Sequence, residues 1–499
     1  MTARTPSVSP GWLGCLGTIL ITCGSYGAGA VRYEGGPLRL IGWDFLAYGH
    51  GGGISNAVFW AGLILVTAAW LLLGSELTRQ PARESDWVPR CRALLLAWTT
   101  PLIFAGPILS RDVYSYLMQG AMVRDGFDPY SEGAAVNPGP FLLEVSHDWR
   151  NTTTPYGPIH LFLGRVITTL TGDHVTAGVI CYKVVSLLGF AAIVWAVPRI
   201  ATRLHSSPAW ALWLGVANPV VLLHMVGGMH NEALMVGLVS LALVLALSCT
   251  STVPRTTIAL RMGAAVILTG IAIALKATAV IAMPFLVWIA TAALTPYYRR
   301  PIPRFLIAGT TMTGLLGLII VALTTLTGSS WGWVGELSGN SKVINPLSIP
   351  SLLAGLITPL GLLLDPTFSY NQLLGTLRTV CTIIMLLGLI AVWWIFRRRP
   401  ADHVRGIVVA YCVALFFNSV TLPWYFASPL SLAGTVELPV WARRVAITLS
   451  VVVALTFTGS GNHKLYVVPL VTLLALVGYG AARIIVPHPS QSQARVGDI

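Results

Sequence analysis

The stretch that decides the fold begins with Leu109-Ser-Arg-Asp-Val-Tyr-Ser-Tyr-Leu-Met-Gln-Gly120 and continues with Gly126-Phe-Asp-Pro-Tyr130 and Thr154-Pro-Tyr-Gly-Pro158. It is polar, and it holds six of the chain's 18 acidic residues. On both sides the sequence alternates between long apolar runs and short basic connectors. We therefore expect residues 110–160 to form an acidic loop outside the membrane-spanning part, and we expect the chemistry to lie there.

The apolar runs place the rest of the chain in a membrane. Of the 499 residues, 55% are hydrophobic and only 10% are charged, with a mean hydropathy of +0.75, whereas about a quarter of the residues of a soluble protein are charged. Runs of about 20 apolar residues, long enough to cross a bilayer, recur from Trp12 to Val486. The sequence predicts an all-α polytopic membrane protein, one integral membrane domain over 1–499, with about 14 transmembrane helices within a range of about 12 to 16.

The net charge of +13 does not indicate nucleic-acid binding, because the basic residues flank the apolar runs. The positive-inside rule explains such a pattern. It predicts a multi-pass protein of the plasma membrane, with the acidic loop on the extracytoplasmic side and the polar tails, 1–10 and 488–499, in the cytoplasm. Ala28-Gly-Ala30 resembles a signal-peptidase site, but the long apolar run before it favours an uncleaved first span. The seven cysteines lie within or beside apolar segments without a CxxC pair, so no disulfide framework or zinc site is expected.

Keeping the arginine-rich connectors on one side fixes the expected crossings. These are residues 12–31, 54–74, 92–109, 176–198, 209–226, 232–249, 258–294 split in two at Lys276, 304–327, 372–396, 404–421, 424–440, 443–458 and 464–486. Two further apolar segments, 159–170 and 346–364, are predicted to be re-entrant or interfacial helices. The second belongs to another extracytoplasmic segment, 328–371. No internal repeat is visible, which argues against an inverted-repeat transporter.

Two carboxylates of the acidic loop are candidate general bases. Asp112 follows Arg111, whose charge favours the ionised form, although a helix N-cap or an ion pair would also explain an aspartate there. Asp128 precedes Pro129, which favours an extended backbone and can aim the carboxylate into a cleft. The same pattern is common in turns, so both interpretations stay open. If the two carboxylates converged they could hold a cation, but we expect neither a metal nor another cofactor.

Lys276 is a lone cation among nearly forty apolar residues. A cation within the membrane costs a few kcal/mol unless it is paired or hydrated, so its presence indicates a partner or a function. The ammonium of Lys276 could hold the phosphate of a lipid carrier. The alternative is that the side chain extends to the membrane interface. His230-Asn-Glu232 opens a span on the side of the acidic loop. Asn231 as N-cap with Glu232 in the first turn explains this motif structurally, and binding of sugar hydroxyls explains it equally well.

Aromatic side chains outside the spans can stack on sugar rings, and they can equally form the ordinary interfacial belt of a membrane protein. His463 and Lys464, which open the last span, are weaker candidates for phosphate or sugar contact. The aromatic candidates are Tyr114, Tyr116, Tyr130, Tyr156, Trp331, Trp333, Trp424 and Tyr425.

The order of the motifs resembles the GT-C superfamily of integral-membrane glycosyltransferases. It runs from Arg111-Asp-Val-Tyr-Ser-Tyr116 through the two proline motifs to His230-Asn-Glu232 and Lys276. More narrowly it resembles the actinobacterial polyprenol-phosphomannose-dependent α-(1→6)-mannopyranosyltransferases of lipomannan synthesis. Asp112 follows the third expected span instead of the first, and position 232 is Glu where related proteins often have Asp.

This resemblance implies an inverting transfer of mannose from polyprenyl phosphate mannose to a mannan glycolipid at the outer face. Asp112 would be the general base, and Lys276 and Arg111 would contact the donor phosphate. The alternatives are an arabinofuranosyl or protein O-mannosyl transferase of the same superfamily and a lipid flippase or transporter. A transporter would spread its charges through the span centres, whereas here they cluster at the outer ends.

Overall fold

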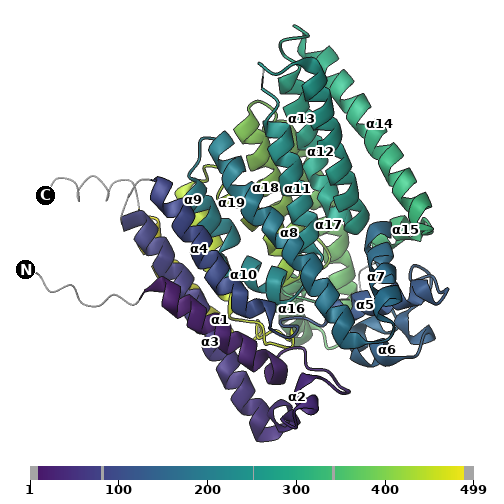
Figure 1. Cartoon of the computed structure of the whole chain (residues 1–499), viewed down its shortest axis with the longest axis vertical. Helices are drawn as coiled ribbons and strands as arrows, with labels where there is room; N and C mark the ends of the chain where they lie inside the picture. Colours follow the sequence, from purple (N-terminus) through teal and green to yellow (C-terminus); the bar gives the residue numbers. More distant parts are fainter. Residues whose placement is uncertain (1–8, 80–83, 251, 340–342, 488–499) are drawn as a thin grey trace, which may run out of the picture.

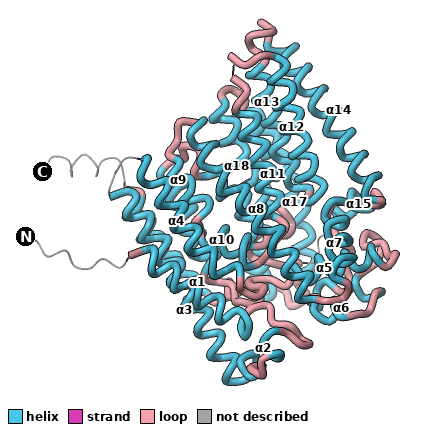
Figure 2. Tube along the Cα trace, in the orientation of Figure 1, coloured by secondary structure: helices cyan, strands magenta, loops and turns pink. Residues whose placement is uncertain are grey.

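The computed structural model describes residues 9–79, 84–250, 252–339 and 343–487, so most of both polar tails lies outside the described residues. The described residues form helices and loops and no β-strand (Figure 2). One isolated β-bridge joins Phe457 to His463. The all-α prediction is therefore confirmed.

The N-terminal half contains the acidic loop and the helices before and after it. They are α1 (Pro10–Ala28), α2 (Pro37–Leu40), η1 (Asp44–Ala47), α3 (Gly49–Arg79), α4 (Glu84–Ile103), α5 (Asp112–Arg124), η2 (Ala134–Val136), α6 (Pro140–Glu144), η3 (His147–Trp149), α7 (Pro158–Thr171), α8 (Val175–Arg203), α9 (Pro208–Ala211), η4 (Leu212–Val216), α10 (Pro219–Leu222), η5 (Leu223–Gly227) and α11 (Glu232–Leu247).

The C-terminal half adds further helices; α12 and α13 contact α11, and α14 stands beside α12 (Figure 1). They are α12 (Arg255–Leu275), η6 (Ala277–Ala282), α13 (Met283–Ala293), α14 (Pro301–Thr327), α15 (Gly332–Gly339), α16 (Ile349–Leu364), α17 (Tyr370–Ile395), α18 (Pro400–Phe417), η7 (Pro423–Phe426), α19 (Ala427–Ala433), α20 (Val440–Ala454) and α21 (Val468–Ile485).

Seven of the described helices are long and apolar enough to cross a membrane: α3, α8, α12, α14, α17, α18 and α21. The number becomes eight if the bent pair 208–216 and 219–227 is one span. The two expected short segments are confirmed as helices of 14 and 16 residues, α7 and α16. The chain is thus a multi-pass helical membrane protein, and the full count of 14 crossings stays a prediction.

Three predicted spans, 92–109, 209–226 and 424–440, were wrong in detail, and in the first of them α4 ends at Ile103. The segment 209–226 is not a straight helix, because Pro219 cannot donate a backbone hydrogen bond and Asn218 caps the second half through Val220 N at 3.0 Å, so the axis bends by 58°. The segment 424–440 is helical only as η7 and α19, which end before Gly434 and Pro439. Eleven helical residues rise only about 16 Å, too little for a crossing.

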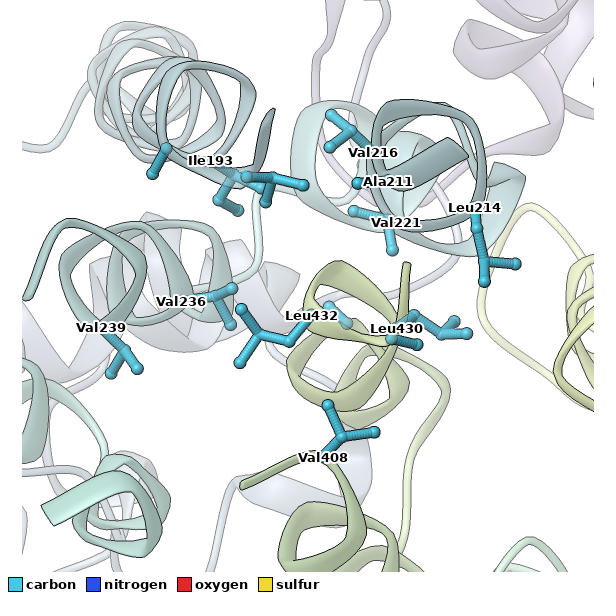
Figure 3. Packing of buried hydrophobic residues seen from close by; sticks show 14 of the residues in the cluster. Ile193, Ala211, Leu214, Val216, Val221, Val236, Val239, Val408, Leu430 and Leu432 are labelled. Carbon is cyan, nitrogen blue, oxygen red and sulfur yellow. The ribbon is translucent and has the colours of Figure 1, made fainter. Parts of the chain in front are cut away.

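The core lies between α8, the bent pair, α11, α18 and α19, where apolar side chains from distant segments meet (Figure 3). Ten of them are labelled there: Ile193, Ala211, Leu214, Val216, Val221, Val236, Val239, Val408, Leu430 and Leu432. The bent pair is also fixed to α3 by Trp70 and Trp213, whose indole N–H groups each donate to the other's backbone carbonyl, at 2.9 and 2.7 Å.

Candidate active site

A cavity of about 170 Å³ opens where four segments distant in sequence meet. Asp112 comes from the start of α5, Tyr156 from the Thr154–Pro158 motif, Lys276 from the break between α12 and η6, and Tyr425 from η7. Four of the residues singled out in the sequence therefore line one space, although nothing in their spacing required it.

The chain positions Asp112 by ending α4 early. Leu109 has a positive φ of 63°, and the Ser110 hydroxyl accepts a hydrogen bond from the Asp112 backbone N–H at 3.0 Å. The expected span 92–109 is helical only as far as Ile103, and Asp112 stands in the first turn of α5, where the helix dipole favours a carboxylate. Its side chain is 11% exposed, enough to reach the cavity.

Two neighbours face the Asp112 carboxylate. The Tyr116 hydroxyl lies 3.5 Å from Oδ2 as a long hydrogen bond, and His230 Nδ1 lies 3.5 Å from the same oxygen. The His230 ring stacks on Trp424 with 3.8 Å between the ring centroids. His230 and Trp424 do not line the cavity, so they support the carboxylate from behind.

Lys276 occupies the break predicted from its charge. Its backbone is extended (φ −151°, ψ 120°), which ends α12 at Leu275. The ammonium makes an ion pair with Glu232 and lies 4.0 Å from the centroid of the Tyr425 ring and 5.8 Å from that of Tyr156. Lys276 lines the cavity whereas the almost fully buried Glu232 does not. The Lys276 ammonium is therefore paired with Glu232 on its buried side, and on its other side it faces the cavity beside the two tyrosine rings.

The Thr154–Pro158 motif closes the cavity because it packs against the end of α12. Gly157 N donates to Leu275 O at 3.3 Å. A Cβ at Gly157 would lie 2.3 Å from Ala274 O, so only glycine allows this approach. The motif and Lys276 are thus held by the same helix end.

His160 was missed in the sequence, where it is a lone histidine in an apolar segment. It contacts Gln119 Oε1 through Nε2 at 3.3 Å and Asn231 Nδ2 through Nδ1 at 3.5 Å, and its ring lies against Tyr156 and Tyr116. Burial lowers the pKa of His160 to about 3; the Lys276 charge adds to this and Asp112 opposes it. The ring is therefore neutral. Asn231 holds this ring and makes no side-chain cap on α11.

Asp128 lies outside the cavity. Its Oδ1 accepts from Tyr130 N and its Oδ2 from Ser330 Oγ, both at 3.0 Å, which is a turn stabilised by its own side chain. Tyr130 packs against Leu161 and Trp333, and Trp331 is half exposed beside Trp333. This group joins the acidic loop to the second segment, 328–371, instead of reaching the cavity.

Arg111 points away from the cavity. It donates to Glu144 O and Val31 O at 2.9 and 2.7 Å, and its guanidinium pairs with Glu144 Oε2 at 3.0 Å. The hydroxyl of Tyr114 donates to Ala30 O at 2.8 Å. Both side chains therefore bind α5 to the segment after α1.

His463 and Lys464 are also outside the cavity. The His463 ring packs near Tyr466, and Lys464 lies 4.9 Å from the Trp60 ring centroid. All seven cysteines are free. Among the described residues no group of three or more His, Cys, Asp and Glu side chains could hold a metal ion.

The small cavity contains a carboxylate, a lysine that is paired with a glutamate on one side, and aromatic rings. The carboxylate can deprotonate a hydroxyl, the lysine can bind an anion, and the rings can contact a sugar. Set among membrane-crossing helices, this site defines an integral-membrane glycosyltransferase.

Comparison with known proteins gives the family. Residues 11–292 match the family model "Alpha-(1->6)-mannopyranosyltransferase, N-terminal domain", and residues 350–486 match the "MptB C-terminal domain". The chain belongs to the α-(1→6)-mannopyranosyltransferase family and is an enzyme, a mannosyltransferase.

Two curated relatives agree with this family over almost the whole chain. Alpha-(1->6)-mannopyranosyltransferase A of Corynebacterium glutamicum is 49% identical over 93% of this chain and 96% of its own length. The protein of the same name from Mycobacterium tuberculosis is 37% identical over 92% and 86%. Among solved structures, the archaeal oligosaccharyltransferase AglB from Archaeoglobus fulgidus matches 85% of this chain and 55% of its own at 13% identity. Its TM-score is 0.34, so no structural argument is drawn from it.

Proposed function

We propose that this mannosyltransferase moves mannose from polyprenyl phosphate mannose to an α-(1→6)-mannan, the glycan of a lipomannan-type glycolipid, at the outer face of the plasma membrane. The observation that carries the proposal is that Asp112 and Lys276 line the same cavity. A base for the acceptor and a cation for a phosphate-linked donor are the two groups that this transfer needs.

Asp112 is the general base of the proposed reaction. Its carboxylate takes the proton from the primary hydroxyl of the acceptor, whose oxygen attacks the anomeric carbon of the donor. The bond from that carbon to the phosphate oxygen breaks, and polyprenyl phosphate leaves with the electron pair. A single displacement inverts the anomeric centre, so a β-linked donor gives an α-linked product.

Lys276 holds the donor phosphate on the face turned away from Glu232. An ammonium has three N–H donors, so one pair with Glu232 leaves others for phosphate oxygens. The pair also fixes the side chain before the donor binds, which lowers the ordering cost. Glu232 is thus a positioning residue. Arg111 binds Glu144 and Val31 and does not line the cavity, so it has no part in the proposed donor site.

Tyr156 and Tyr425 are the aromatic residues that we assign to the sugars, because both line the cavity on either side of Lys276. Tyr116 and His160 hold Tyr156 through edge and tilted ring contacts of 5.5 and 4.3 Å between centroids. Positioning of donor and acceptor supplies much of the catalysis in such a reaction, because phosphate is already a tolerable leaving group. The proposed chemistry uses no metal or other cofactor.

The donor test uses membranes that contain the full chain. We expect radiolabelled polyprenyl phosphate mannose to transfer its mannose to a short α-(1→6)-mannoside, and linkage analysis to find a new α-(1→6) bond. Transfer only from GDP-mannose would overturn the donor assignment. Transfer of arabinose from a prenyl-linked arabinose donor would replace the proposed sugar, and a mannosylated protein would replace the proposed acceptor. Lipid translocation without any transfer would overturn the proposal.

A further inference from the structure

A second cavity of about 500 Å³ lies between α13, α14 and α17, at the end of these helices away from the catalytic cavity. The segment from Ala277 to Ala293 joins the two sites, because it begins directly after Lys276 and carries Trp288 and Thr291 into the second cavity. The start of α14 lies at this end and its last turn lies near α7 and α15 (Figure 1). Its 27 residues rise about 40 Å, so the two sites are far apart.

The walls of this cavity are aromatic. Trp288 stacks on both Phe305 and Trp393, with centroid distances of 4.6 and 5.3 Å, and the rings of Phe305 and Trp393 are themselves 6.1 Å apart. The neighbouring faces of α14 and α17 carry large exposed apolar side chains, such as Leu306 and Ile390. These faces lie in the hydrocarbon of the bilayer, so acyl chains reach the mouth of the cavity.

The rim is cationic. Arg304, Arg397 and Arg398 line the cavity, and no acidic residue does. Arg299, Arg300 and Arg399 are next to them in the sequence. None of these six arginines forms an ion pair with a carboxylate in the part of the chain that the structure describes. The nearby Asp402 is engaged by Arg405 at 3.5 Å.

The arginines are placed for an anion within the cavity. Arg397 donates to the carbonyl of Trp394 and lies over the Trp394 ring, and Arg304 donates to Thr295, so both side chains are already oriented. The Nε of Arg304 is shielded from solvent and has no partner among the described residues. A topological bias for basic residues would explain their number, but not an aromatic-walled cavity with a shielded, unused donor at its edge.

We infer that this cavity binds an anionic phospholipid. Its phosphate lies among Arg304, Arg397 and Arg398, and its acyl chains run along the exposed faces of α14 and α17. Basic pockets between transmembrane helices commonly hold lipid headgroups of this kind. This inference is independent of the donor, the acceptor and the orientation proposed above.

The test measures lipid bound to the full chain in detergent by native mass spectrometry, with phosphatidylglycerol and phosphatidylcholine as probes. We expect phosphatidylglycerol to be retained preferentially, and its apparent affinity to fall at least about tenfold in R304Q/R397Q/R398Q. The matched control, R79Q/R92Q/R199Q, removes the same charge outside the cavity and keeps wild-type affinity.

Each other outcome overturns the inference. Equal retention of the two lipids by wild type shows no anion site, and unchanged affinity in the triple variant places the site elsewhere. Displacement of phosphatidylglycerol by an equal concentration of inorganic phosphate identifies a site for a soluble anion. If the triple variant does not fold, Arg398→Gln replaces it, because the side chain of Arg398 has no hydrogen bond to lose among the described residues. A severalfold loss of affinity relative to Arg199→Gln is then required.

Discussion

At the scale of single residues, the site depends on which carboxylate and which cation face the cavity. The residues alone left both Asp112 and Asp128 open as the base, the family resemblance favoured Asp112, and the three-dimensional contacts separate the two. Asp128 uses both carboxylate oxygens to hold its own turn and Ser330, whereas Asp112 borders the open space. The sequence indicates which side chains are charged, but it could not show which way they point.

The ion pair of Lys276 and Glu232 yields a prediction that separates binding from stability. Lys276→Ala leaves a buried carboxylate unpaired, which costs about 3–5 kcal/mol, so loss of transfer by this variant alone is ambiguous. In Lys276→Met/Glu232→Leu both charges are gone, and we expect the melting temperature to recover while donor binding stays lost. A purified double variant that binds labelled donor like wild type would show that Lys276 is structural.

His160 gives a prediction about pH. Its folded pKa of about 3 lies below the unfolded value of about 6.5, so the unfolded chain takes up a proton that the folded chain refuses. The neutral ring therefore contributes stability above about pH 6.5 that is lost as the pH falls towards about 3. We expect the melting temperature of His160→Gln to fall less than that of wild type between about pH 7 and about pH 4. An identical pH dependence of the two proteins would mean that His160 titrates normally.

At the scale of elements, the positions of the site residues depend more on the breaks between helices than on the helices themselves. The break at Lys276 was predictable, because an isolated cation in a long apolar run marks a helix end or a cavity. The bend at Asn218 was not predicted, although Pro219 follows it. The early end of α4 at Ile103 has no clear sequence signal beyond nearby glycine and proline. Apolar periodicity finds helices, whereas local backbone turns set the position of the site.

Gly157 tests the role of one such contact. Gly157→Ala places a methyl group against Ala274 O and pushes the Thr154–Pro158 motif off the end of α12. We expect mannosyl transfer in membranes to fall at least about tenfold, the loss that a misplacement of about 1 Å can cause. Gly263→Ala on α12 is the matched control, since its added Cβ meets open space. Equal activity in the two variants would contradict a positioning role for this motif.

At the scale of the whole molecule, composition alone was enough to predict a multi-pass helical protein. It was not enough to predict how many crossings there are, because several helices near the core, such as α11 and α20, are shorter than a bilayer needs. The assembly of the cavity from four distant segments was also beyond sequence reasoning. The sequence gives the polar residues, but tertiary packing determines which of them come into contact.

The orientation can be measured by cysteine labelling in intact cells. In a variant without the seven natural cysteines, we expect a membrane-impermeant maleimide to label Asn151→Cys in the acidic loop directly. Arg299→Cys, at the opposite end, is expected to react only after permeabilisation, because the positive-inside rule places it in the cytoplasm. The reverse pattern would move the active site to the cytoplasmic face.

The most direct test of the account compares mannosyl transfer by Asp112→Asn and Asp128→Asn at matched expression, together with binding of polyprenyl phosphate mannose. Both variants remove one carboxylate from the acidic loop, but only the first removes the proposed base. We predict that Asp112→Asn lowers the turnover by about 10²–10⁴ with donor binding retained, and that Asp128→Asn stays within a few-fold of wild type. Full turnover in Asp112→Asn, or the larger loss in Asp128→Asn, would contradict the assignment of Asp112 as the general base.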